Sequence, residues 1–475
     1  MVEIAFPITT APGNRPGEGA GRLVNCYAEQ LQGGARATYA RRRSPGLTAM
    51  AVTEHGGMRG MHYDGNGTLY IAQAERLLRV NVVLGEFAVT DIGELPGEGR
   101  VTFARNNKAP VPDILCVTEN DVYVITPDAP PASLDDGDLP QPLTVCFLAG
   151  YFIFAIRDGR VFFSGINDVT ISALDFGKAE NRPGGILGAY PYGEMLILCG
   201  PSSIEVWQNA GNATGSPFSR AAVIPRGLAS TFAIAGFEDG FSSIVFVGDD
   251  NGVYLLGGGY TPTKISPPDL DRLIEKVADK TAMDVTVSVT SGHNWVAVTG
   301  PGFTWEYEVQ TGLWHERESY QEQNWRARCS AAAFGGWVVG DRLTGQVWML
   351  DPDAAKEGSE PLVMSVVSQP ASGFPNRIAI PRADFDFIAG QGKVSGDEPI
   401  DTDPVVLISW SDNGGASFGV PVQRSLGRMA RWANRVTVNR TGMTGPYGRV
   451  WKIDVSDPVF VSLLSGQMDA DPRSR

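Results

Sequence analysis

The sequence has few of the residues that build redox, metal or disulfide sites. Its 475 residues include four histidines and five widely spaced cysteines, and no two cysteines form a Cys-x-x-Cys pair: Cys26, Cys116, Cys146, Cys199 and Cys329. An odd number of isolated cysteines argues against a disulfide framework and against a zinc site. The histidines include no His-x-x-x-His pair, so we predict no metal site.

Signals for a membrane or a secretory route are also missing. No run reaches the ~18 uninterrupted apolar residues of a membrane span. The first residues, MVEIAFP, have neither the basic nor the apolar region of a signal peptide. We expect a protein that is made and folded in a reducing cytoplasm and has no membrane partner.

Catalytic and nucleotide-binding motifs are absent too. The chain has no Gly-x-Ser-x-Gly elbow and no Gly-x-x-x-x-Gly-Lys-Ser/Thr loop. We therefore predict no catalytic residue, no cofactor-binding residue and no cofactor. The net charge of −14 disfavours a protein that mainly grips DNA, because such affinity comes chiefly from Lys and Arg. It suits a conduit through which DNA slides, and it equally suits any protein that must not adhere to nucleic acid.

Turn-forming residues, in contrast, are abundant and spread along the chain, with 57 glycines and 32 prolines. This distribution predicts a mostly β protein made of short strands and tight turns. Residues 46–355 repeat an apolar run, a turn and a second run with Tyr or Trp, as in Glu194–Leu198 followed by Ile204–Trp207. The repeats recur roughly every 40 to 50 residues, which is the period of propeller blades. We predict a β-propeller of about seven blades, with six as the alternative.

Three other segments complete the predicted organisation. Residues 1–45 are rich in Gly and Pro and are expected to form an extended N-terminal arm that docks either on its own chain or on a neighbouring subunit. Residues 267–278 place apolar side chains on one helical face behind two prolines, which predicts a helix inside the propeller. Residues 356–475 are assigned to a separate C-terminal β-sandwich-like domain.

The C-terminal domain contains an Asp-box-like turn between two strands, in the sequence Ser411-Asp-Asn-Gly-Gly-Ala-Ser-Phe418. In such a turn a Ser, an acidic or amide side chain and two glycines satisfy the backbone groups, and an aromatic residue plugs the core. Asn413 stands where the pattern usually has Asp, which puts any calcium or carboxylate role in doubt. The predicted turn residues are Ser411, Asn413, Gly415 and Phe418.

Two basic runs are candidate interfaces. One combines cations with a tryptophan, and the other lies beside the arm: Arg424, Arg428, Arg431 and Trp432, and Arg41, Arg42 and Arg43. Interleaved cations and a tryptophan can bind nucleic acid, but they also form protein–protein hot spots. In an acidic chain we favour the protein–protein interpretation.

Four motifs together resemble the packaged-DNA stabilisation proteins, or tail hub and nozzle proteins, of short-tailed bacteriophages. They are Arg22–Glu29, Arg43–Leu47, Ser411–Phe418 and Arg449–Pro458, so the resemblance extends from near the first residues to the last strand. It implies a propeller body without a cofactor in a sixfold ring matched to a twelvefold portal. It also implies contacts with portal and adaptor proteins and with a tail needle, fibre or spike, transient passage of phage DNA, and a place in the virion tail after assembly in the host cytoplasm.

Two alternatives stay open. Asp-boxes also occur in sialidases, so the chain could be a glycan-binding or sialidase-like propeller enzyme whose arginines converge at the propeller mouth, with Arg59, Arg157, Arg226 and Arg328 as candidates. It could also be a general propeller scaffold for unrelated partners. A single box that lies outside the repeats favours the phage resemblance over the enzyme.

Overall fold

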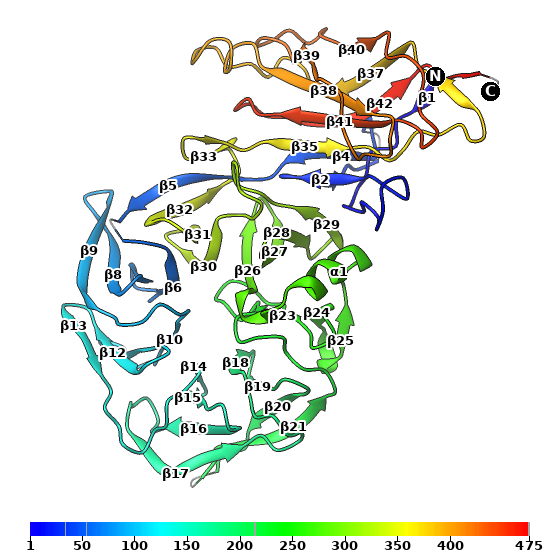
Figure 1. Cartoon of the computed structure of the whole chain (residues 1–475). Coiled ribbons are helices and arrows are strands. Elements are labelled where there is room, and N and C mark those ends of the chain that lie inside the picture. Colours follow the sequence, from blue (N-terminus) through cyan, green and yellow to red (C-terminus); the bar gives the residue numbers. More distant parts are fainter. Residues whose placement is uncertain (34, 54, 213–214, 474–475) are drawn as a thin grey trace. The chain divides into compact units, whose positions relative to one another are not determined.

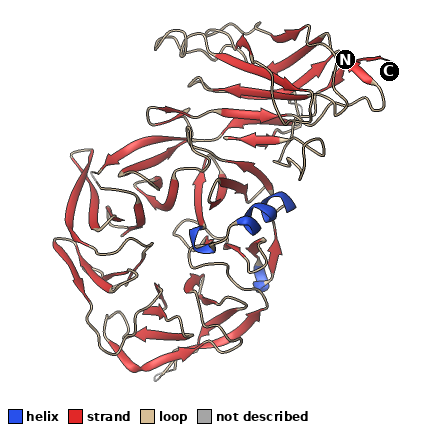
Figure 2. Cartoon of the chain, in the orientation of Figure 1, coloured by secondary structure: helices blue, strands red, loops and turns tan. Residues whose placement is uncertain are grey.

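The computed structural model describes residues 1–33, 35–53, 55–212 and 215–473, and strands make up most of its regular structure (Figures 1 and 2). The predicted all-β class is confirmed. The chain divides into two compact units, which are described separately below. Unit 1 comprises Met1–Thr48, Gly302–Trp325 and Asp351–Arg475, and unit 2 comprises Ala49–Pro301 and Arg326–Leu350.

Unit 2 consists of antiparallel sheets whose strands pair in chain order. Five sheets have four strands each: β6 (Met58–Tyr63), β7 (Thr68–Gln73), β8 (Arg76–Val83) and β9 (Glu86–Glu94); β10 (Thr102–Arg105), β11 (Ile114–Val117), β12 (Val122–Thr126) and β13 (Ala129–Ser133); β14 (Thr144–Leu148), β15 (Tyr151–Ala155), β16 (Arg160–Ser164) and β17 (Ile171–Lys178); β18 (Gly188–Tyr192), β19 (Met195–Cys199), β20 (Ile204–Asn209) and β21 (Phe218–Ile224); β22 (Ile234–Ala235), β23 (Val245–Val247), β24 (Val253–Leu256) and β25 (Pro262–Lys264).

Two further sets of paired strands follow in unit 2. They are β26 (Asp284–Thr290) with β27 (His293–Gly300), and β30 (Ala327–Ala333) with β31 (Gly336–Asp341) and β32 (Gln346–Asp351). Together with the five four-stranded sheets, these two sets, which are parts of larger sheets, give seven groups of paired strands in the described part of unit 2, the number of blades predicted from the repeats. β15 shows why these segments form strands: its residues Phe152–Ala155 are all buried, as expected where a sheet is covered on both faces.

The sheets of unit 2 pack face to face through shared apolar cores. One core joins the first sheet to the second, others join the second to the third and the third to the fourth, and Met58 and Leu69 of the first sheet share a core with Cys329 and Val338 of the last. Because the first sheet packs on the last, the row of sheets closes into a ring, as Figure 1 shows.

Residues just before the first sheet hold this closure. The backbone N–H of Thr53 donates to the carbonyl oxygen of Gly345 at 3.1 Å, and Gln346 Nε2 donates to the carbonyl oxygen of Ala51 at 2.7 Å. Ala51 belongs to β5 (Gly46–Val52), so the start and the end of the unit's sequence meet here. Such closure removes the open sheet edges that favour aggregation.

The predicted helix is confirmed as α1 (Pro268–Lys276). It begins at a proline, whose missing N–H and fixed φ suit the first helical turn. Leu270 and Ile274 are buried, and the backbone N–H of Val277 donates to the Ile274 carbonyl oxygen at the C-terminal end. Two 3-10 turns lie nearby in the sequence, η1 (Gly258–Tyr260) and η2 (Lys280–Ala282).

Unit 1 contains two larger sheets. The first has the order β3-β4-β42-β37-β40, with β1 also paired to β42, and the second runs β28-β29-β2-β35-β41-β38-β39. Their strands are β1 (Val2–Glu3), β2 (Arg22–Val24), β3 (Cys26–Gln30), β4 (Tyr39–Arg43), β28 (Phe303–Glu308), β29 (Leu313–Glu316), β35 (Met364–Val367), β37 (Arg382–Phe387), β38 (Val405–Ser411), β39 (Val422–Ser425), β40 (Val436–Asn439), β41 (Val450–Val455) and β42 (Ser462–Met468). Short pairings involve β33 (Lys356–Glu357), β34 (Glu360–Pro361), β36 (Arg377–Ala379) and β43 (Asp471–Arg473).

The two larger sheets share one apolar core. Phe385 of the first sheet meets Trp451 of the second edge to face, with ring centroids 5.5 Å apart. Ile4 and Leu23 from the N-terminal segment are buried in the same core. The period-2 pattern of buried residues in β41 is that of a strand with one face on a core.

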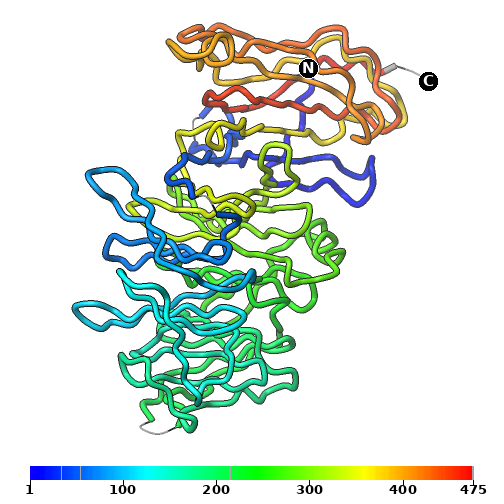
Figure 3. Tube along the Cα trace, turned by 60° about the vertical axis from the view of Figure 1, so that its left-hand side comes forward, coloured from blue at the N-terminus to red at the C-terminus, as the bar shows by residue number. Residues whose placement is uncertain are grey.

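Residues 1–45, for which the sequence predicted an extended N-terminal arm, belong to this unit. β4 pairs with β42 and β2 pairs with β35, so the segment adds strands to both sheets, and in Figure 3 its blue trace lies among the orange and red C-terminal strands. Of the two docking options left open, the structure shows docking on the same chain. The contacts that unite the segment with C-terminal strands join residues more than 300 positions apart, which no local pattern reveals.

Candidate functional site

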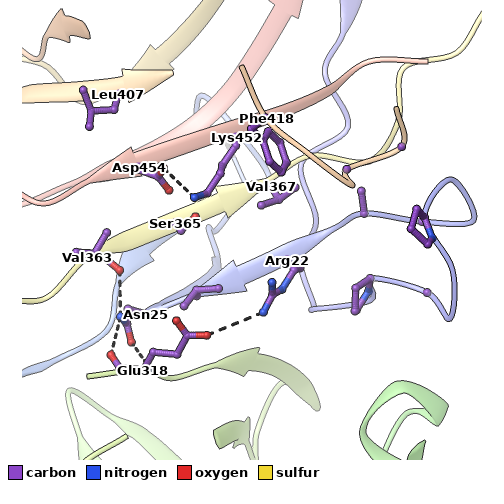
Figure 4. Close-up of a pocket in the computed structure, with 18 of the residues that line it drawn as sticks. Arg22, Asn25, Glu318, Val363, Ser365, Val367, Leu407, Phe418, Lys452 and Asp454 are labelled. Atoms are coloured by element: carbon purple, nitrogen blue, oxygen red, sulfur yellow. Dashed lines mark hydrogen bonds and ion pairs between the residues drawn. The ribbon is translucent and has the colours of Figure 1, made fainter. Parts of the chain in front are cut away.

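Unit 1 contains a cleft of about 800 Å³ beside the Asp-box-like turn. The N-terminal loop, the segment 318–322 and strands β35 and β41 form its walls, and Gly414, Gly415 and Phe418 of the turn contribute to the lining (Figure 4). A volume of this size is within the range of ligand pockets in proteins. The cleft is therefore the main candidate for a binding site in this unit.

Charged groups in and beside the cleft are largely paired with one another. Arg22 binds Glu316 through two nitrogens, with Nε 2.9 Å from Oε1, and its Nη2 lies 4.0 Å from Glu318 Oε1 (Figure 4). Burial and the nearby Glu316 raise the pKa of Glu318. Lys452 Nζ lies 3.0 Å from Asp454 Oδ2 on another wall. These walls can hold a polar partner, but they leave little uncompensated charge for a small ion.

Asn25 fastens the base of the cleft. Its Nδ2 donates to the carbonyl oxygens of Glu318 at 2.9 Å and Val363 at 3.0 Å, and its Oδ1 accepts the Glu318 backbone N–H at 2.9 Å. A single amide thus joins three segments of the chain. Asn25 has a φ of 51°, a conformation that Asn tolerates better than most residues.

The Asp-box-like turn is held by its own side chains. Ser411 Oγ accepts the backbone N–H of Gly415 at 3.0 Å, and Asn413 Oδ1 accepts the backbone N–H of Ser417 at 3.0 Å. Phe418 packs on a small core of Ala20, Val367 and Val450. The amide of Asn413 supplies the acceptor that a carboxylate would supply, which is why the turn forms without Asp at this position.

Glycines of this turn also receive the N-terminal loop. The backbone N–H of Gly17 donates to the Gly414 carbonyl oxygen at 3.2 Å. Gly414 has a φ of +74°, and a Cβ there would lie 2.6 Å from the Gly17 nitrogen. Both the conformation and the close approach therefore favour glycine at position 414.

Sequence reasoning missed the main electrostatic contact of the turn, which involves Asp412 rather than Asn413. Arg449 is fully buried and makes a two-pronged bond to Asp412, with Nε–Oδ1 at 2.9 Å and Nη2–Oδ2 at 2.8 Å. Its guanidinium also lies over the rings of Trp410 and Trp451. Two signals in the sequence could have indicated this ion pair. They are the acidic residue directly before Asn413 and the arginine that opens the last motif.

The run Arg41–Arg43 lies on β4, and two of its members donate to backbone carbonyl groups of their own chain. Arg41 is 8% exposed and donates to the backbone carbonyl oxygens of Phe6, Pro7 and Leu464. Arg43 donates to those of Val455, Asp457 and Val459, and burial lowers its pKa to about 10. Arg42, on the opposite face of the strand, pairs with Glu29 at 2.5 Å. Within this chain, Arg41 and Arg43 thus link β4 to neighbouring segments through their carbonyl groups.

The other basic run begins on β39 with Arg424 and continues through the surface segment before β40. Trp432 is 69% exposed, Arg428 and Arg431 are exposed, and Arg424 is half-buried, with Nε bonded to the Thr437 carbonyl oxygen at 2.7 Å. Of the three arginines in this run, only Arg428 forms an ion pair with an acid in the described part of the chain. Its Nε lies 3.5 Å from Asp403 Oδ2. This loop offers the features of a protein–protein hot spot.

Unit 2 has its own cavity, a central channel of about 390 Å³. The first strands of the sheets line it, together with Arg100, Glu238 and several aromatic side chains. Of the arginines considered for a sialidase-like mouth, Arg59 donates to the carbonyl oxygens of Ala74, Leu95 and Gly99. Arg226 pairs with two acids of another sheet, Asp249 and Asp250, whereas Arg328 lies near Asp284 and Arg157 is exposed. These contacts hold Arg59, Arg226 and Arg328 in separate places rather than in one anion-binding triad.

One buried cluster contains a serine, a histidine and an acid. His315 Nε2 lies 2.7 Å from Glu306 Oε2 and 3.4 Å from Ser44 Oγ, and Arg317 also contacts Glu306. In a serine hydrolase the serine and the acid contact different ring nitrogens, so that the imidazole can relay a proton. Here both contact the same nitrogen in a buried position, which indicates a structural role.

Residues 1–33, 35–53, 55–212 and 215–473 contain no group of three or more His, Cys, Asp and Glu side chains placed to hold a metal ion. No helix in the same part of the chain is long and apolar enough to cross a membrane.

A ring of seven sheets around a central channel defines a β-propeller protein, and the predicted propeller body is confirmed. A family model described as "Bacteriophage P22 Gp10, beta-propeller" matches residues 21–355. The chain therefore belongs to this family of phage stabilisation proteins. The match includes the motifs Arg22–Glu29 and Arg43–Leu47, whereas the Asp-box-like turn and Arg449–Pro458 lie beyond its end.

No curated protein matches the chain. Among solved structures, one described as "Crystal structure of WD40 beta propeller domain of Doa1" matches with 10% identity and a TM-score of 0.42, over 64% of this chain and 97% of that chain. Similarity at this level bears on neither ligand nor partner.

Proposed function

We propose that this protein is a structural component of a short-tailed phage tail that retains packaged DNA. The observation that carries the proposal is the family match over residues 21–355. In this proposal the copies form a ring, a hexamer, below the portal and adaptor, and the ring extends the DNA channel. The protein acts in the virion tail after assembly in the host cytoplasm, without catalysis and without a cofactor.

The size of the central channel supports a DNA path outside the propeller. A volume of about 390 Å³ suits a small molecule. Duplex DNA, whose major groove alone is about 12 Å wide, cannot thread such a space. DNA would therefore pass between copies arranged around the ring axis. The net charge of −14 favours sliding over retention by phosphate contacts.

Two features of unit 1 are suited to contacts with other tail proteins. The exposed loop with Arg428, Arg431 and Trp432 has hot-spot composition, and we assign it to the neighbouring copy or to the portal and adaptor proteins. The charged side chains of the cleft beside the Asp-box-like turn are mostly paired with one another. We assign this cleft to a segment of a tail needle, fibre or spike protein.

The proposal is tested on phage particles and on the isolated protein. A phage that lacks this gene should package DNA and then lose it, so its ratio of filled to empty heads should fall, and supplying the gene should restore the ratio. Native mass spectrometry with the portal–adaptor complex should show about six copies bound. Normal numbers of filled, infectious heads without the gene would overturn the proposal, and so would single bound copies in the spectrum.

A variant separates the loop from the rest of the molecule. Arg428→Ala, Arg431→Ala and Trp432→Ala combined should leave the melting temperature almost unchanged, because these side chains are exposed, but should reduce binding to the complex. Arg36→Ala is a matched control, since Arg36 is an exposed arginine of the same unit. Equal binding by the triple variant and the control would show that the loop is not an interface.

A further inference from the structure

Three arginines converge on one carboxylate in unit 2. Asp284, at the start of β26, is 4% exposed. Its Oδ1 accepts a bond from Arg100 Nη1, and its Oδ2 lies 3.2 Å from Arg342 Nη1 and 3.8 Å from Arg328 Nε. The arginines come from three places: the link before β10, strand β30 and the turn after β31. We call Arg100, Arg328, Arg342 and Asp284 the three-arginine site.

The arginines are held in place by other contacts. Arg100 Nε donates to the Arg59 carbonyl oxygen at 2.9 Å, and its guanidinium lies 4.6 Å from the ring centroid of Phe232. Arg328 Nη1 donates to the Met58 carbonyl oxygen at 3.3 Å. Arg100 also lines the central channel, so the site lies next to that cavity. These contacts hold the like charges close together.

The site has more positive charge and more donors than Asp284 satisfies. Arg342 Nε and Nη2 and Arg328 Nε are covered by neighbouring atoms and have no hydrogen-bond partner in the described part of the chain. Burial and the adjacent Arg100 and Arg342 lower the pKa of Arg328, against the pull of Asp284. Arg100 also acts on Glu238, whose charged form is disfavoured by burial. Buried donors without a partner are rare in folded proteins and call for an explanation.

We propose that the three-arginine site binds a phosphate group as a second counter-ion beside Asp284. Guanidinium groups match the oxygens of a phosphate in two-pronged geometry. A phosphate group carries a charge of about −1.5 to −2 near neutral pH, which balances the two positive charges that Asp284 leaves. The side chains of Arg100, Arg328 and Arg342 are 13%, 27% and 20% exposed, so part of each side chain is open to solvent, and a phosphate group has to displace the atoms that cover the unpaired nitrogens. This proposal does not depend on the function proposed above.

Calorimetry with inorganic phosphate tests the site on the full chain. Titration in chloride buffer at constant ionic strength should show saturable binding, and the melting temperature should rise with the logarithm of phosphate concentration. Arg342→Gln should weaken binding at least tenfold. Arg226→Gln is the matched control, because Arg226 is 29% exposed in the same unit but pairs with both Asp249 and Asp250, and its phosphate affinity should stay at the wild-type value.

Short oligonucleotides then identify the source of the phosphate. If only a 5′-phosphorylated strand competes with inorganic phosphate, the site binds a terminal phosphate. If phosphorylated and unphosphorylated strands compete equally, it binds a backbone phosphate. If neither strand competes, it binds free phosphate. Absence of saturable phosphate binding to the wild-type protein would overturn the proposal, as would wild-type affinity in Arg342→Gln. If Arg342→Gln does not fold, Arg328→Gln serves the same comparison.

Discussion

Arg449 and Asp412 form a two-pronged ion pair that ties the Asp-box-like turn to the last motif of the chain. The arginine is fully buried, and Thr441 Oγ1 accepts a further bond from its Nη1 at 2.6 Å. The carboxylate is partly exposed, with 35% of its side-chain surface open to solvent. The acid of the turn thus neutralises a buried cation rather than serving a ligand.

Replacing this acid should therefore destabilise unit 1. Asp412→Ala leaves the Arg449 guanidinium buried without its counter-ion, which should cost about 2 to 4 kcal/mol of unfolding free energy. Asp412→Asn keeps one acceptor and should cost less. Chemical denaturation of both variants measures the difference, with Arg36→Ala as the control, because Arg36 and Asp386 form an exposed pair expected to contribute under about 1 kcal/mol. Equal losses in Asp412→Ala and Arg36→Ala would contradict the assignment.

The contact between Gly17 and Gly414 predicts a local effect. Gly414→Ala adds a Cβ that would lie 2.6 Å from the Gly17 nitrogen, so the N-terminal loop should leave the turn. Hydrogen–deuterium exchange should speed up in a peptide covering residues 11–21. Gly442→Ala is the control, because Gly442 has a similar φ of +81° but open space around its Cβ position. It should show only the strain of the backbone, about 1 kcal/mol, without faster exchange in the loop.

Glu238 in the central channel predicts a pH dependence of stability in unit 2. Burial raises its pKa from 4.5 to about 7. A hydrogen bond from the Gly236 N–H at 2.6 Å lowers the pKa, but by less than burial raises it. A raised carboxyl pKa means that the folded state binds the proton more tightly, so its contribution to stability is full below pH 4.5 and is lost as the pH rises through 7.

Glu238→Gln should remove this dependence. Because the side chain keeps some solvent contact, we expect a gain of about 1 to 2 kcal/mol at pH 8 and little change at pH 4.5. Thermal unfolding at both pH values measures it. Glu194→Gln is the control, since Glu194 is exposed in the corresponding link of the preceding sheet. A destabilised Glu238→Gln at pH 8 would show that the charged form is favoured after all.

The sequence predicted features that depend on local chemistry. The turn at Asp250–Gly252 lies between β23 and β24 because Asp, Asn and Gly satisfy a tight turn by themselves, and repetition of such units revealed the ring. The pair Arg100–Asp284 could not be predicted, because it joins residues 184 positions apart and depends on ring closure. Arg41 and Arg43 were assigned to an interface, yet their i, i+2 spacing on a strand already placed both on one face, opposite Arg42. Nothing local indicated that this face is the inner one.

All five cysteines are free and buried, which predicts slow thiol chemistry in the native state. Burial raises the pKa of each thiol, to about 12 for Cys146, so little thiolate is present at pH 8. A thiol reagent such as DTNB should react with fewer than one group in native protein and with five after denaturation. Rapid reaction of one thiol in the native state would show that its segment opens locally.

Truncation tests whether the N-terminal segment and the C-terminal strands form one folding unit. Removing residues 401–475 deletes β38 and β41, and it also deletes β42, which lies between β4 and β37. Leu23, Met364 and Phe385 would then lose the side chains that cover them, including Trp451 and Leu463. We expect rapid proteolysis within residues 1–48 and 351–400. The free energy lost when these apolar side chains become exposed is larger than the few kcal/mol of net stability of a domain.

The control truncation removes only residues 471–475. It deletes β43, which pairs with β36 alone, and should leave both segments resistant to protease. Resistance of residues 1–48 in the longer truncation would show that the segment folds without the C-terminal strands.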